Sequence, residues 1–161
     1  GSSVLLAAGQ ELTAAQLLGM RLDADIVVLS ACHTGDGGPL RGGELLGIGR
    51  ALLAAGARAA VVTRWAVNDL SATLLMVEFH RLRAEGKPPA EALTLAGMYL
   101  RGLTGADAIA RFTELAGPAF TAHASAERVA ATVRDLEAED GPNAPFDHPY
   151  HWAPFVLITA E

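Results

Sequence analysis

Three continuous apolar runs mark the chain, at residues 26–29, 59–63 and 155–158. Their residues are apolar or β-branched throughout rather than at alternate positions, which is typical of strands buried on both faces of a parallel sheet. Another short apolar run, at residues 4–8, ends at Gly9 and predicts an edge strand or one arm of a hairpin. The pattern therefore predicts an α/β fold with a mostly parallel sheet flanked by helices.

Between these runs, apolar residues recur at the spacing of a helix. The predicted helices cover residues 14–18, 44–55, 69–83 and 90–103. Thr13 and Asp69 stand where N-caps are expected for two of them, and Gly56 ends the second helix. For the helix at 69–83, the predicted core face is Leu70, Thr73, Leu74, Val77 and either Phe79 or His80.

The order strand, glycine-rich loop, helix and strand between residues 26 and 63 predicts one βαβ unit with parallel strands. Residues 104–147 carry two further helical patterns, at 107–115 and 126–139, and few signals of a buried strand. This segment is expected to be a helical insertion within a single domain that spans residues 1–161. It either covers a groove, binds a partner or packs at the periphery, and the last is favoured because helical patterns mostly report burial.

The charge balance argues against two classes of partner. The 161 residues include 12 basic and 18 acidic side chains, for a net charge of −6, and Lys87 is the only lysine. Without a basic cluster, neither nucleic acid nor an anionic membrane is an expected partner. No apolar run reaches the roughly 20 residues that cross a bilayer.

Cysteine use and the first residues bear on the compartment. A single cysteine forms no internal disulfide, which is usual in a reducing compartment. Residues 1–3 lack the basic start of a signal peptide, so a cytoplasmic protein is expected. No metal site is expected, because His148 and His151 lack two further convincing ligands.

The single cysteine, Cys32, stands at the C-terminal tip of the strand that begins at residue 26. Binding sites in open parallel sheets lie just beyond the carboxyl ends of the strands. The following stretch, residues 35–43, is rich in glycine, which lets main-chain N–H groups approach a ligand closely. A nucleophilic cysteine needs such a turn, with N–H groups directed at a developing oxyanion. The alternative is a buried structural cysteine, the usual role of a lone cysteine.

Residues 28–35, Val-Leu-Ser-Ala-Cys-His-Thr-Gly, resemble the active-site strand of CHAT domains, which belong to the caspase-like cysteine peptidases. Other segments are similar to the same family: the loop and helix after the cysteine at 41–48, the next helix-to-strand step at 54–62, a tryptophan-containing loop at 65–69 and the closing strand at 148–157. The resemblance runs from about residue 12 to 103 and resumes near His148. It implies a caspase-like three-layer fold and a cysteine endopeptidase that uses no cofactor.

On this resemblance, Cys32 is the nucleophile, and Cys32, His33 and Gly35 belong to the loop that forms the oxyanion site. The implied substrate is a protein or peptide. Because CHAT domains in bacteria are often fused to helical-repeat or effector domains, such domains are further expected partners.

One departure from the family pattern concerns the general base, a histidine followed by glycine at the end of the strand before the cysteine strand. Residues 1–25 contain no histidine, and residues 4–18 resemble the segment that follows the base. The chain is therefore expected to be the C-terminal portion of a CHAT domain, with the base upstream and the sheet incomplete at its N-terminus. Alone it is expected to be inactive, because an unassisted thiol with a pKa of about 8.5 stays mostly protonated. His33 is not expected to replace the base, since neighbouring side chains in an extended chain point apart.

The resemblance also implies where a substrate binds. The loop at 64–69 lines the groove, and Trp65 offers a flat apolar wall with one N–H donor; the alternative is a core tryptophan. Asn68 and Asp69 either line the same groove or cap the next helix. Ser30 occupies the position at which relatives specific for basic residues carry an acid, so a preference for basic residues is not expected.

Two other functions compete with the peptidase. A non-catalytic CHAT-type module would bind partner proteins and keep Cys32 only as a relic. A nucleotide-binding protein would use the glycine-rich loop for phosphate, but the loop has no G-x-x-x-x-G-K-[ST] pattern and no G-x-G-x-x-G spacing. The peptidase is therefore the leading hypothesis and the binding module the alternative.

Overall fold

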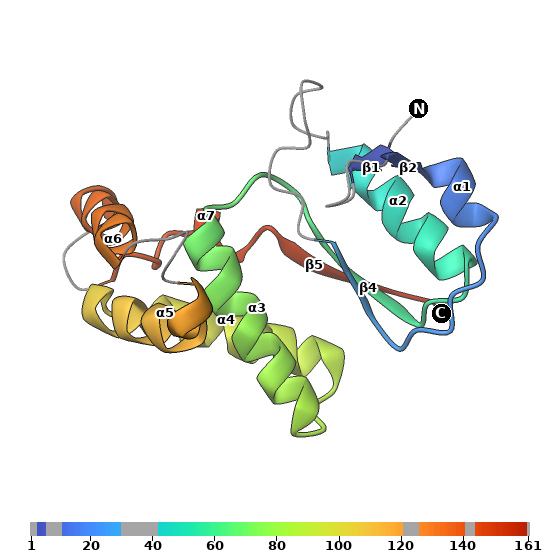
Figure 1. Ribbon diagram of the computed structural model, residues 1–161. Coiled ribbons are helices and arrows are strands. Elements are labelled where there is room, and N and C mark those ends of the chain that lie inside the picture. Colours follow the sequence, from blue (N-terminus) through green and yellow to red (C-terminus); the bar gives the residue numbers. More distant parts are fainter. Residues whose placement is uncertain (1–2, 6–10, 30–41, 121–125, 141–143, 161) are drawn as a thin grey trace. The chain divides into compact units, whose positions relative to one another are not determined.

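The computed structural model (Figure 1) describes residues 3–5, 11–29, 42–120, 126–140 and 144–160. The chain divides into two compact units, Gly1–Val67 with Pro154–Glu161, and Asn68–Ala153. All strands that the structure describes belong to the first unit, and the described part of the second consists of helices and their connections.

A sheet of three strands, in the order β3-β4-β5, organises the first unit. The strands are β3 (Val27–Leu29), β4 (Ala59–Thr63) and β5 (Phe155–Thr159). β3 runs parallel to β4, with Leu29 beside Val62, so the predicted βαβ unit is confirmed. Every residue of β4 is buried, as its continuous apolar pattern predicts.

The direction of β5 corrects the prediction of a mostly parallel sheet. β5 pairs antiparallel with β4, with Phe155 beside Thr63, and the Arg64 N–H donates to the Pro154 carbonyl at 2.9 Å. The chain leaves β4 at Thr63 and rejoins the sheet beside the same residue. A strand that starts there has to run antiparallel to β4. An apolar run does not encode strand direction, which is why the sequence pattern missed this.

Burial also differs between the strands. β3 is half-buried along its length, and β5 is buried at Phe155 but half-buried or exposed beyond it. Each of these strands has a single neighbour in the described sheet, whereas β4 lies between two. The expectation of burial on both faces therefore holds for β4 alone.

The N-terminal hairpin and first helix follow the sequence signals. β1 (Ser3–Leu5) pairs antiparallel with β2 (Glu11–Thr13), so the run at 4–8 begins with a hairpin arm. Thr13 caps α1 (Ala14–Leu18): its Oγ1 accepts from the Gln16 N–H at 3.2 Å, and Gln16 Oε1 accepts from the Thr13 N–H at 2.8 Å. This reciprocal capping box satisfies two N–H groups that the helix leaves without partners.

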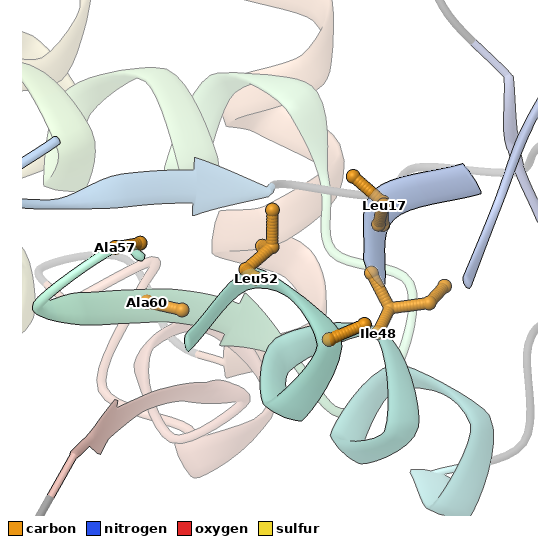
Figure 2. Packing of buried hydrophobic residues seen from close by; sticks show 6 residues of the cluster. Leu17, Ile48, Leu52, Ala57 and Ala60 are labelled. Carbon is orange, nitrogen blue, oxygen red and sulfur yellow. The ribbon is translucent and has the colours of Figure 1, made fainter. Parts of the chain in front are cut away.

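α2 (Gly42–Ala54) packs against α1 and β4 and contributes Ile48, Ala51 and Leu52 to the core of the first unit. The buried cluster comprises Leu17, Ile48, Ala51, Leu52, Ala57 and Ala60, most of which Figure 2 labels. A Cβ added at Gly49 would lie 2.5 Å from Ile158 Cδ1, so this glycine allows α2 to approach β5. The half-buried side chains of Val27 and Leu29 pack against the same cluster, which ties β3 to α2.

Gly56 makes the turn from α2 into β4. Its φ is +112°, a conformation that L side chains rarely adopt, and a Cβ there would lie 2.4 Å from the Leu22 carbonyl oxygen. The Leu22 N–H donates to the Ala55 carbonyl at 2.7 Å, which holds the two segments at this separation. The glycine is therefore required by both backbone conformation and contact.

The second unit contains α3 (Asp69–Ala84), α4 (Pro89–Gly102), α5 (Gly105–Phe120), α6 (Ala126–Asp140) and α7 (Pro149–Trp152). α3 packs against α4, α5 and α7, and α5 packs against α6. The helical patterns predicted between residues 104 and 147 are thus present as α5 and α6. The short helix α7 was not predicted. Among the described residues, no helix has both the length and the apolar character to cross a membrane.

The buried face of α3 corrects the predicted core face. Leu70 and Leu74 are buried as expected, and of the two alternatives Phe79 is buried and His80 exposed. Thr73 is exposed and Val77 only half-buried, contrary to the prediction. The face also includes Ser71, Ala72, Leu75, Glu78 and Leu82. It is wider than a single stripe because α3 contacts three other helices of its unit.

Replacing Gly56 by Ala is expected to lower the free energy of unfolding by about 2–4 kcal/mol, through left-handed strain and the contact with Leu22. Gly47→Ala is the matched control, because Gly47 is an exposed residue of α2 with nothing within 4 Å of an added Cβ. That change is expected to stabilise the protein by about 0.5–1 kcal/mol. Urea unfolding measures both, and equal effects of the two changes would contradict the proposed turn geometry.

Candidate active site

The carboxyl ends of β3 and β4 form the edge at which the predicted site residues leave the sheet. Leu29 and Val62 lie side by side in the parallel pair. Cys32 follows Leu29 by three positions, and Trp65 follows Val62 by three. Ser30, Cys32, His33 and Gly35 lie outside the described residues, so their roles stay predictions.

Trp65 is half-buried, unlike the five fully buried residues of β4 that precede it. The guanidinium carbon of Arg64 lies 5.8 Å from the centroid of the Trp65 ring, a cation–π arrangement. Part of the indole is therefore accessible to a ligand, although the neighbouring arginine already covers some of it.

Asn68, and not Asp69, is the N-cap of α3. Its Oδ1 accepts from the Leu70 N–H at 2.9 Å, and its carbonyl accepts from Ser71 Oγ at 2.8 Å. Asn68 has extended backbone angles, whereas Asp69 is already the first helical residue. The expectation that Asp69 caps the helix is therefore wrong by one position, because both residue types cap well and the sequence does not distinguish them.

The exposed carboxylate of Asp69 still stabilises the helix, since it stands in the first turn beside the positive end of the helix dipole.

Trp65 belongs to the first unit, and Asn68 and Asp69 belong to the second. Within its own unit Asn68 has a structural role, which leaves Trp65 as the described residue best suited to contact a substrate.

The three described histidines all belong to the second unit. His80 is exposed on α3 and contacts the edge of Phe79 at a centroid distance of 5.2 Å. His148 caps α7, with Nδ1 accepting from the Tyr150 N–H at 3.2 Å. His151 is buried and meets both Phe146 and Tyr150 edge to face, with centroid distances of 5.7 Å.

Charged pairs on α3 and near the start of α4 hold their cations ionised. Arg81 donates from Nε to Glu78 Oε2 at 2.8 Å and also contacts Glu85, and these carboxylates raise the pKa of Arg81. The hydrogen bond to Glu91 raises the pKa of Lys87. With their pKa values raised, Arg81 and Lys87 stay protonated near neutral pH and cannot accept a proton there. In the described ranges, no group of three or more His, Cys, Asp or Glu side chains can hold a metal ion.

A sequence profile of the CHAT domain family matches residues 1–160. The chain belongs to the CHAT domain family. This match confirms the resemblance seen in the sequence and extends it across residues 104–147. CHAT domains are associated with caspase-like peptidases. No curated protein and no solved structure matches the chain.

In this CHAT domain, the sequence placed the loop at 64–69 along the groove but did not predict the contact of Arg64 with Trp65. The sequence does show a basic residue directly after the apolar run of β4. An isolated arginine, however, usually indicates only a solvent-exposed position. Its contact with Trp65 depends on how the strand ends, which the sequence pattern does not reveal.

Asn68→Ala is expected to lower the free energy of unfolding by about 1 kcal/mol, because the Leu70 N–H loses its partner. Asn68→Asp, which keeps an acceptor at the same place, is expected to change it by less than about 0.5 kcal/mol. Asp69→Asn is the control for general effects in this turn, with a cost of about 0.5 kcal/mol from the lost dipole interaction. Thermal unfolding measures all three, and a larger cost at Asp69 than at Asn68 would overturn the cap assignment.

Proposed function

We propose that this CHAT domain is a cysteine endopeptidase that hydrolyses peptide bonds in a protein or peptide substrate, with Cys32 as the nucleophile. The observation that carries the proposal is the parallel register of β3 and β4, with Leu29 beside Val62. The family membership supports it, because CHAT domains are associated with caspase-like peptidases.

The register supports a shared location for the proposed nucleophile and the proposed substrate wall. Cys32 and Trp65 each follow the paired residues by three positions, and three residues of chain span at most about 10 Å. Both segments therefore continue from the same edge of the sheet, where sites in open α/β sheets lie. A peptide that binds against the Trp65 indole would then lie within reach of the Cys32 thiol.

In the proposed reaction, the Cys32 thiolate attacks the scissile carbonyl carbon, and its sulfur–carbon bond forms as the carbonyl π pair moves to oxygen. Main-chain N–H groups of the Cys32–Gly35 loop stabilise that oxyanion. The carbon–nitrogen bond then breaks as the amine takes a proton from the imidazolium of the base. Water hydrolyses the thioester, which returns the proton to the base and frees the sulfur.

The proposed general base is a histidine upstream of residue 1, as the family pattern implies. Two of the described histidines already have other roles, which supports this choice: His148 caps α7, and His151 is buried against two aromatic rings. The proposal places Ser30 and Trp65 along the substrate groove. Fused helical-repeat or effector domains in a bacterial cytoplasm would present the substrate.

The decisive experiment uses the protein that carries the upstream histidine and treats it with a peptidyl ketone reagent directed at thiols. Wild-type protein is expected to be labelled and to cleave peptides, and Cys32→Ala is expected to lose both activities. Replacing the upstream histidine by Ala is expected to slow ketone labelling by about 100-fold or more, while iodoacetamide still alkylates Cys32 at high pH.

Cleavage that persists in Cys32→Ala would show that Cys32 is not the nucleophile. A different result would identify the non-catalytic interaction module. In that case Cys32 of the wild type reacts with iodoacetamide, but the protein neither cleaves peptides nor reacts preferentially with the peptidyl ketone. Because the chain has one cysteine, alkylation within it reports on this position alone.

A further inference from the structure

Arg64 lies directly after β4, at the edge where Trp65 also lies. Its main-chain N–H donates to the Pro154 carbonyl at 2.9 Å, so the sheet still holds its backbone. Its side chain is exposed, and the guanidinium carbon lies 5.8 Å from the centroid of the Trp65 ring. The arginine therefore projects from an anchored position and lies over the Trp65 ring, and it forms no ion pair with a described residue.

The described arginine at the other end of β4 differs in this respect. Arg58 precedes β4 and lies 3.6 Å from the carboxylate of Asp25. Arg101 repeats the stacking in the second unit, 5.0 Å from the Trp152 centroid, but it also binds Asp147 at 3.0 Å. Arg64 takes part in no salt bridge with any described residue.

A guanidinium that stacks through its face keeps its N–H donors in the plane, where two of them can bind both oxygens of one carboxylate. Arg101 already uses two of its donors on Asp147, whereas no described carboxylate occupies those of Arg64. The net charge of the chain is −6, so an acidic peptide gains nothing from long-range attraction and must be recognised by local contact.

We propose that Arg64, held on the face of Trp65, binds an acidic side chain of the substrate close to the scissile bond. The peptidase would then prefer acidic peptides over neutral ones of the same shape. This inference rests on the proposed function, because it places the carboxylate in the groove served by Cys32.

The test compares three peptidyl ketones that differ only in the residue before the reactive carbonyl, which is Asp, Asn or Lys. The rate of Cys32 labelling is measured in the protein with its upstream histidine. In the wild type, the Asp reagent is expected to react about three- to tenfold faster than the Asn reagent. Arg64→Gln is expected to remove this difference, and Arg64→Glu is expected to favour the Lys reagent.

Two further variants separate recognition from structure. Arg64→Lys keeps the charge but loses the planar pair of donors, so part of the preference for Asp is expected to remain. Arg101→Gln removes an arginine that also stacks on a tryptophan, and it is expected to leave the preference unchanged.

Equal labelling by the Asp and Asn reagents in wild type, with none in Cys32→Ala, would overturn the role of Arg64 and leave the peptidase intact. A uniform fall for all three reagents in Arg64→Gln would also overturn it, because it would indicate a structural effect. If none of the reagents labels Cys32 while iodoacetamide does, the proposed function itself fails, and the inference fails with it.

Discussion

The pairing of β4 with β3 is the interaction on which the rest of the structure depends. β4 is buried at each of its residues, and a one-residue slip would turn its side chains to the opposite face of the sheet. The cluster around Ile48 and Leu52 on α2 packs against one face of this pair, which secures the register. Burial of each such aliphatic side chain contributes about 1.5–3 kcal/mol. The position at which the chain leaves β4, and hence the place of Arg64 and Trp65, follows from that register.

The return of the chain along β5 strengthens the same edge. The bond from the Arg64 N–H to the Pro154 carbonyl extends the β4–β5 pairing one step beyond Thr63. The helices between the two strands form their own unit, with caps at Asn68 and His148 near its two ends. The proposed site therefore depends on β4 being paired with a strand on each side. The helical unit is stabilised separately, by its own core.

Sequence reasoning succeeded where local chemistry determines the structure. The capping box at Thr13, the positive-φ turn at Gly56 and the buried run of β4 each have a cause within a few residues. It failed for the direction of β5, which depends on where a distant segment rejoins the sheet, and for the choice between Asn68 and Asp69 as cap. The role of Cys32 has its support in the family motif and in the register of β3, and the contact of Arg64 with Trp65 became visible only in three dimensions.

The most direct test of this account asks whether Cys32 and Trp65 share one edge of the sheet. The chain has one cysteine and two tryptophans, so replacing each tryptophan in turn shows which of them quenches a bimane fluorophore attached to Cys32. If Cys32 and Trp65 share that edge, the emission is expected to be quenched in the unchanged chain, to recover in Trp65→Phe and to stay quenched in Trp152→Phe. Emission that is bright in the unchanged chain, or that recovers only in Trp152→Phe, would contradict it.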